Sequence, residues 1–305
     1  MFNNPPPEDR KRHPLEREPQ QKATPPPPAD GSEPPRRSTE PPRQRVTLHI
    51  ATVKPYVTYG IIAINVAIFV LRALNRQIDF DLLLWGANHP PDVLQNGEVY
   101  RLVTSMFLHA SIYSTFGAFA LQNALHLIFN MYILYMEGTR TEQIFGHLRF
   151  AAIYFLGGLA GSVLSTVLND PSVYSLGASG AVFAVLGARW VFLYKHRILF
   201  GAGGRFERAR VTQLLVLNLV FGLLTALSGG SALGRVDNFA HLGGALGGAA
   251  LAWAIAPFFV LRTHPDQTNH LVAEDINPLR NHYRELTLFA LSLMAVLIVG
   301  RLMFA

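Results

Sequence analysis

The sequence has 305 residues, of which 50% are hydrophobic and 15% charged, and it contains no cysteine. So apolar a composition is unusual for a water-soluble domain, and the missing cysteines exclude disulfides, thiolate metal sites and a cysteine nucleophile. The net charge of +6 does not indicate nucleic-acid binding, because the basic residues lie mainly in the N-terminal tail and in loops beside apolar segments. The composition indicates a membrane protein with several spans.

Residues 1–46 are rich in proline and mixed charge and contain almost no large apolar residues. Such a segment cannot bury enough surface to offset the entropy of ordering, so we expect a disordered, cytoplasmic tail with polyproline II character. A solvated arm is favoured over a ligand for a proline-binding partner. We expect no cleaved signal peptide, because the first apolar run begins near Tyr56 and is long enough to span a membrane.

Seven apolar runs follow the tail, each near the roughly 20 residues that cross the hydrocarbon of a bilayer. Their approximate bounds are 56–75, 122–138, 150–168, 177–194, 211–228, 238–260 and 286–304. The chain is therefore expected to be an all-α polytopic membrane protein.

The loop from Lys195 to Arg210 sets the orientation of these spans. It carries five lysines and arginines against one acid, Glu207, which predicts a cytoplasmic location. Counting spans in both directions places the tail, residues 140–149 and residues 262–284 on the same side. A bacterial plasma (inner) membrane is the expected location, and an organelle membrane is the alternative.

Polar residues occur near the outer ends of the second, fourth and sixth spans. His126 and Asn130 lie in the second, Ser179 in the fourth and His241 in the sixth. At 1.5 Å per residue, all four fall within roughly 10 Å of the outer end of the hydrocarbon. Strongly polar residues at membrane depth are functional candidates, so we predict a single site just below the outer surface. Interhelical hydrogen bonding is the alternative for His126 and Asn130.

The chemistry of these residues fits acyl transfer. A serine hydroxyl becomes a nucleophile when a base takes its proton, and a neutral histidine suits that task. Ser179 would be the nucleophile and His241 the base. The Ser179 N–H, as an unpaired amide at a helix start, with His126 and Asn130 could donate to an oxyanion. Asp237 is expected at the watery edge, so a dyad is favoured over a triad.

The fourth and sixth spans also carry the small residues that allow close helix packing. In the sixth, Ala240, Gly244 and Gly248 recur at four-residue intervals, and the fourth offers Gly180 on a comparable face. This small-xxx-small pattern lets membrane helices approach closely. Close packing would bring a serine and a histidine on different helices together.

The stretch from roughly Tyr56 to Ala256 resembles the rhomboid family of intramembrane serine proteases. The family motif G-x-S-G stands here as Gly177-Ala178-Ser179-Gly180, its A-H-x-x-G as Ala240-His241-Leu242-Gly243-Gly244, and its H-x-x-x-N as His126-Leu127-Ile128-Phe129-Asn130. The resemblance implies the catalytic and oxyanion roles given above, with Gly177 ending the loop into the serine. It also implies a rhomboid-like six-helix core over 56–260. The apolar runs beyond that core predict a cytoplasmic linker over 261–285 and an additional C-terminal transmembrane helix over 286–305.

Three features depart from the family pattern. Tyr100-Arg101 stands where the family usually has Trp-Arg, in a long first external loop that also contains Trp85-Gly86-Ala87-Asn88. Extra residues, Ser111 to Leu125, separate His109 from His126, which affects the loop beside the oxyanion pair. Phe183 is the expected stacking partner of the catalytic histidine, but it offers no hydroxyl. His109 itself is not expected to be catalytic.

These observations predict an intramembrane serine endopeptidase that cleaves transmembrane segments of other proteins near the external face. Its partners would be those substrates and the lipid bilayer, with no cofactor, metal or nucleic acid. The alternative is a catalytically inactive rhomboid-like protein that binds transmembrane clients without cutting them. A transporter would need charged or broken helices near the midplane, and the sequence contains neither these nor the motifs of metalloproteases and aspartyl proteases.

Overall fold

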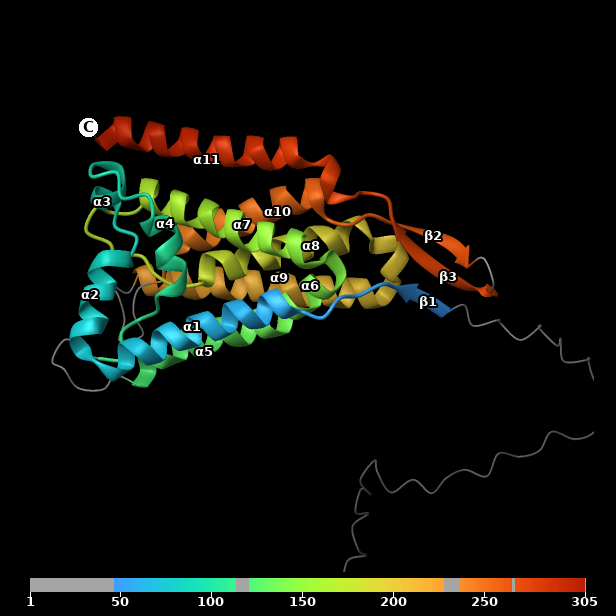
Figure 1. The fold of residues 1–305 in the computed structure, drawn as a ribbon, viewed down its shortest axis with the longest axis horizontal. Helices are drawn as coiled ribbons and strands as arrows, with labels where there is room; N and C mark the ends of the chain where they lie inside the picture. The colour runs from blue at the N-terminus through green and yellow to red at the C-terminus, as the bar shows by residue number, and fades with distance from the viewer. Residues whose placement is uncertain (1–46, 114–120, 228–235, 265–266, 305) are drawn as a thin grey trace, which may run out of the picture. The chain divides into compact units, whose positions relative to one another are not determined.

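The computed structural model describes residues 47–113, 121–227, 236–264 and 267–304, and the predicted disordered tail, residues 1–46, lies outside the described residues. Helices dominate the fold (Figure 1). The long helices are α1 (Tyr56–Leu74), α5 (Leu121–Ile133), α7 (His147–Leu168), α8 (Ser179–Lys195), α9 (Arg197–Leu227), α10 (Asn238–Ile255) and α11 (Tyr283–Phe304).

Shorter elements connect these helices. Between α1 and α5 lie α2 (Arg76–Gly86), α3 (Pro90–Leu94), α4 (Arg101–Thr104) and the 3-10 turn η1 (Ser105–Phe107). A π-helical turn, η2 (Leu134–Gly138), and α6 (Thr139–Phe145) continue α5. The remaining elements are strands β1 (Thr47–Ile50), β2 (Phe259–His264) and β3 (Gln267–Asp275) and the 3-10 turn η3 (Leu279–Asn281).

The long helices agree with the predicted all-helical membrane protein. Among the described residues, α1, α7, α9 and α11 are long and apolar enough to cross a membrane. The other three predicted spans correspond to the shorter helices α5, α8 and α10, of 13, 17 and 18 residues. The protein is therefore a multi-span membrane protein, and the number of seven crossings stays a prediction.

Helices α7, α8 and α10 form the tightly packed centre of the fold, and glycines set their spacing. A Cβ at Gly244 of α10 would lie 2.0 Å from the carbonyl oxygen of Gly180 on α8, and one at Gly248 would lie 2.0 Å from that of Ala184. A Cβ at Gly161 of α7 would lie 2.6 Å from the Ala240 oxygen. The backbones therefore meet without side chains between them, as the small-residue pattern predicts.

The C-terminal part of the sixth predicted span is not helical. Helix α10 ends at Ile255, two residues before Pro257, and the apolar residues that follow enter strand β2. Proline disfavours helical backbone at the residue before it, which explains the early end. Strand β3 lies between β1, to which it is parallel, and β2, to which it is antiparallel (Figure 1). The segment expected as a linker, 261–285, thus contains most of a β-hairpin.

Helix α9 begins earlier than the predicted fifth span. It runs from Arg197 through a kink at Gly201, where φ is +49°, so much of the basic loop is helical. Some of the charges in this part form ion pairs: the buried Glu137 of η2 contacts Arg189 of α8 at 2.8 Å and Arg210 of α9 at 2.6 Å. Pairing of this kind offsets the cost of removing charges from water.

The segments predicted to be cytoplasmic gather at one end of the helices. Lys195 donates to the Trp253 carbonyl near the end of α10, and Arg149 pairs with Asp275 of β3. The carboxylate of Glu142 accepts hydrogen bonds from the Thr58 N–H and hydroxyl at 2.7 and 2.6 Å, so the start of α1 lies there too. The opposite ends of α5, α8 and α10 carry the predicted site.

Candidate active site

Ser179 is the first residue of α8, and Gly177, two positions before it, has a backbone conformation that other residues do not adopt easily. Gly177 has φ +128°, in the left-handed region that favours glycine. Its N–H donates to the Ser105 carbonyl at 2.9 Å. Because Ser179 opens the helix, its own N–H has no partner one turn earlier. The turn therefore presents a half-buried serine hydroxyl and a backbone donor together.

The loop that leads to Ser179 is held by the first external loop. Asn88 and Ser175 exchange two backbone hydrogen bonds, at 2.8 and 2.9 Å. The Asn88 side chain donates to the Ser162 carbonyl on α7 and accepts from the Thr166 hydroxyl. The buried Asn88 thus ties the two loops to α7 and limits the positions that Ser179 can take.

His241 lies on α10 at the level of the first turns of α8. Its ring stacks on Phe183, with centroids 4.1 Å apart and planes 9° from parallel. Phe183 is one turn after Ser179, so the stack brings the imidazole to the serine end of α8. The neighbouring backbones also meet, because a Cβ at Gly180 would lie 3.4 Å from the Ala240 oxygen. Ser179 and His241 therefore lie on facing turns of packed helices.

Asp237 caps α10 and does not bond to the histidine ring. Its carboxylate accepts from the Ala240 N–H at 2.9 Å and from the hydroxyls of Ser165 and Ser175. The Nδ1 atom of His241 is buried and has no hydrogen-bond partner among the described residues. In this arrangement no carboxylate among the described residues forms a hydrogen bond with the imidazole of His241.

His126 on α5 lies beside the turn that precedes Ser179, and Asn130 is one helical turn further along α5. A Cβ at Gly177 would lie 2.9 Å from Cε1 and 3.2 Å from Nε2 of His126, so the imidazole edge contacts the glycine itself. Asn130 is buried, and its Nδ2 donates to the His126 carbonyl at 2.8 Å. An amide nitrogen has two hydrogens, so this bond orients the side chain and leaves one N–H for another acceptor.

His109 lies behind His126 despite the extra residues between them. The two rings meet edge to face with centroids 5.3 Å apart. The His109 Nε2 lies 3.0 Å from the Asn65 Oδ1, and Arg72 donates to the His109 carbonyl at 2.8 Å. Burial, together with the nearby His126 and Arg72, lowers the pKa of His109 well below its ordinary value. A neutral imidazole therefore supports His126.

The first external loop has a buried arginine at its centre. Arg101 donates to the carbonyls of Leu84 and Ala87 and pairs with Glu98 at 2.6 Å. Tyr100, which stands where the family usually has tryptophan, stacks on Trp85 with centroids 5.1 Å apart. The substituted tyrosine thus keeps an aromatic contact within the loop.

The structure thus brings Ser179, His241, Phe183, Gly177 and Gly180 together where α8 and α10 meet, with His126 and Asn130 beside them. Sequence reasoning missed the residues that support the site: Asn88, Ser175, Asn65 and Arg72. Only Asn88 had a signal, because it lies in the stretch Trp85-Gly86-Ala87-Asn88. Among the described residues no group of three or more His, Asp or Glu side chains could hold a metal ion.

The fold and the site together define a helical membrane protein in which a serine, two histidines and an asparagine gather near one end of the helices. The family profile of the rhomboid domain matches residues 96–258, about half of the chain. The chain belongs to the rhomboid family. Phe183, Gly177 and the rest of the site all lie inside the matched residues.

Three curated relatives indicate what the family contains. RHOMBOID-like protein 6, mitochondrial, from Arabidopsis thaliana is 34% identical over 56% of this chain and 48% of its own length. Rhomboid protease GluP from Bacillus subtilis is 32% identical over 66% of this chain and 35% of its own length. Rhomboid-like protease 1 from Toxoplasma gondii is 28% identical over 63% of this chain and 61% of its own length. The chain thus spans from about a third to three fifths of these proteins, two of which are named as proteases.

Proposed function

We propose that this protein is an intramembrane serine endopeptidase that uses a Ser179–His241 dyad. The observation that carries the proposal is the stack of His241 on Phe183, which holds an imidazole beside the first turn of α8. In the reaction, the Ser179 Oγ attacks the scissile carbonyl while His241 accepts the hydroxyl proton. His241 then returns the proton to the leaving amine, and water hydrolyses the acyl-enzyme by the same steps in reverse order.

The tetrahedral intermediates carry a negative oxygen that needs donors. The Ser179 N–H and the His126 ring lie at the turn of Gly177, and Asn130, bonded to the His126 carbonyl, would supply one further N–H. Preorganised donors of this kind are typically worth about 3–4 kcal/mol each when one is removed. Hydrogen bonds that fix Asn130 and His109 in place supply that preorganisation.

The substrate class follows from the location of the site. Transmembrane segments of other proteins would reach it from the bilayer, and a helical peptide bond must leave its helix before attack because its carbonyl is hydrogen-bonded. Segments with helix-weakening residues are therefore the expected substrates. We propose the bacterial plasma membrane as the location, because one relative is bacterial. An organelle membrane is the alternative, because another relative is named as mitochondrial.

The test uses purified full-length protein in detergent with a single-span substrate that carries glycine and serine near its outer end. Cleavage should occur with wild type and should be lost in Ser179→Ala and in His241→Ala. Ser292→Ala on α11, an exposed serine far along the sequence from the site, is the matched control and should cleave normally. A fluorophosphonate probe, which labels activated serines, should mark wild type and Ser292→Ala only.

The inactive client-binding alternative gives a different result. Folded wild type would then neither cleave several substrates nor react with the probe, and it would bind a transmembrane substrate equally well with and without Ser179. Cleavage that survived Ser179→Ala would exclude both the dyad and the proposed nucleophile.

A further inference from the structure

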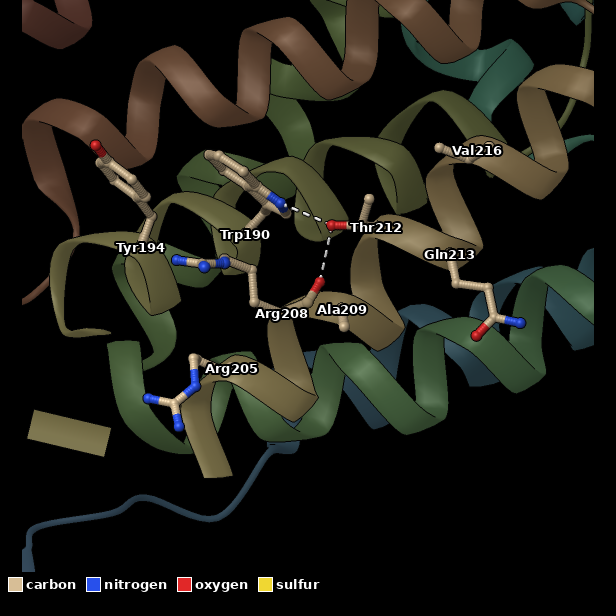
Figure 2. A pocket seen from close by; sticks show the side chains of 8 residues that line it. All are labelled: Trp190, Tyr194, Arg205, Arg208, Ala209, Thr212, Gln213 and Val216. Carbon is tan, nitrogen blue, oxygen red and sulfur yellow. Dashed lines mark hydrogen bonds between the residues drawn. The ribbon is translucent and has the colours of Figure 1, made fainter. Parts of the chain in front are cut away.

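A groove between α8 and α9 lies far from the proposed catalytic site, at the end of the helices that carries the basic loop. Its volume is about 610 Å³. Trp190 and Tyr194 line it from α8, and Arg205, Arg208 and Thr212 line it from α9 (Figure 2). The hydrolytic proposal gives this groove no role.

The two arginines of the groove differ from their neighbours in having no acidic partner. Among the described residues, neither Arg205 nor Arg208 forms an ion pair, whereas Arg189 and Arg210 share the carboxylates of Glu137 and Glu207. The nearby acids are thus already occupied. The groove therefore contains two guanidinium groups that no carboxylate neutralises. Guanidinium groups bind phosphate well because they are planar and always charged.

Aromatic side chains form the wall of the groove opposite these arginines. Trp190 and Tyr194 stack with centroids 5.6 Å apart, and the Trp190 N–H donates to the Thr212 hydroxyl at 2.9 Å (Figure 2). Arg208 lies over the Tyr194 ring at 5.8 Å. Tryptophan and tyrosine are enriched where membrane spans meet the headgroup region, so this wall fits the depth of lipid headgroups.

The groove becomes apolar along α9. Val216 lines its far end, and eleven residues of helix separate it from Arg205, which corresponds to about 16 Å at 1.5 Å per residue. Beyond it the exposed face of α9 is apolar, including Leu217, Val220 and Leu224. A phospholipid is long enough to reach from the arginines at one end of the groove to the apolar side chains about 16 Å away, with its phosphate at the first and part of an acyl chain at the second.

We propose that the α8–α9 groove binds an anionic phospholipid, with its phosphate at Arg205 and Arg208 and an acyl chain along Val216. Basic pockets between membrane helices at the cytoplasmic side bind anionic headgroups in this way. The lipid would occupy the surface between α8, which carries Ser179, and α9. This inference does not depend on the protein being an active protease.

The experiment measures lipid binding to the full-length protein in neutral detergent by native mass spectrometry. The probe is phosphatidylglycerol, compared with phosphatidylcholine and with glycerol phosphate, which has the anion but no acyl chain. Each arginine near a membrane surface contributes about fivefold to anionic lipid affinity, so the double variant Arg205→Ala/Arg208→Ala should bind phosphatidylglycerol roughly 30-fold more weakly. Its thermal unfolding should match wild type, because neither arginine pairs with an acid.

The control variant is Arg280→Ala/Arg284→Ala, which removes two arginines outside the groove, in η3 and at the start of α11. It should bind phosphatidylglycerol as wild type does. An equal loss in both variants would overturn the proposal in favour of a general charge effect, and no loss in either would overturn it directly. Equal binding of phosphatidylcholine would exclude selection by charge, and full competition by glycerol phosphate would show a site for a free anion instead.

Discussion

Alanine at Gly244 tests whether helix spacing positions the proposed pair of Ser179 and His241. The new Cβ would lie 2.0 Å from the Gly180 oxygen, and real Cβ atoms essentially never come within 3.0 Å of another atom. The backbones of α8 and α10 must therefore separate by about 1 Å, the difference between those distances. Gly180 adjoins Ser179, and Gly244 is one turn after His241, so this separation moves the two groups apart.

The expected result combines lost stability with a larger loss of activity. Overpacking in a tight core costs about 1–3 kcal/mol, and a misplacement of about 1 Å at reacting groups lowers rates by about 100-fold. We expect Gly244→Ala to cleave a single-span substrate about 100-fold more slowly at a temperature where it remains folded.

Gly60→Ala is the matched control, because nothing lies within 4 Å of the Cβ added in α1. Its activity should be unchanged, and replacing glycine inside a helix should stabilise the protein by about 0.5–1 kcal/mol. Thermal unfolding in detergent and initial cleavage rates measure both quantities. If Gly244→Ala behaved like Gly60→Ala, helix spacing would not position the site.

Two further predictions concern aromatic and histidine contacts. Phe183→Tyr should retain the stack on His241 and most activity. Phe183→Ala should be labelled by the fluorophosphonate about two- to tenfold more slowly, because aromatic pairs contribute about 0.5–1.5 kcal/mol beyond burial. Equal labelling rates would argue against a positioning role. Burial lowers the pKa of His196, whose Nε2 accepts from the Phe259 N–H at 3.0 Å. The unfolded chain therefore binds more protons below about pH 6.5, so stability present above that pH should fall as the pH falls toward the folded-state pKa. His196→Gln should flatten this dependence in thermal unfolding measured from pH 7.5 to 5, and an unchanged slope would contradict the assignment.

Much of the site is predictable from the sequence because its residues belong to short local motifs. Ser179 begins a helix after a glycine, and glycines at four-residue intervals indicated the close contact of α8 and α10. The expected stack of Phe183 was inferred from the family resemblance and the helical spacing to Ser179, and the ring contact with His241 agrees with it.

What the sequence did not predict depends on residues far apart in the chain. Asn88 meets Ser175 across 87 positions, and neither residue has a neighbour that marks it as paired. The apolar run through Phe259 and Val260 predicts too long a helix, because Pro257 ends α10 at Ile255 and the residues after it enter β2. The start of α9 was misplaced because its charges were interpreted as a loop, whereas ion pairs such as Arg210 with Glu137 allow them in a packed helix.

A hydrogen bond joins the described residues on either side of the stretch 114–120, which belongs to the extra residues between His109 and His126. The Asn123 side chain donates to the Ser111 carbonyl at 2.6 Å, and His109 is fixed separately through Asn65. Lengthening the chain between two points that are already joined costs little free energy, since each doubling adds only about 0.6 kcal/mol. An epitope tag or fluorescent label inserted within residues 114–120 should therefore report on the protein while leaving the histidine pair undisturbed.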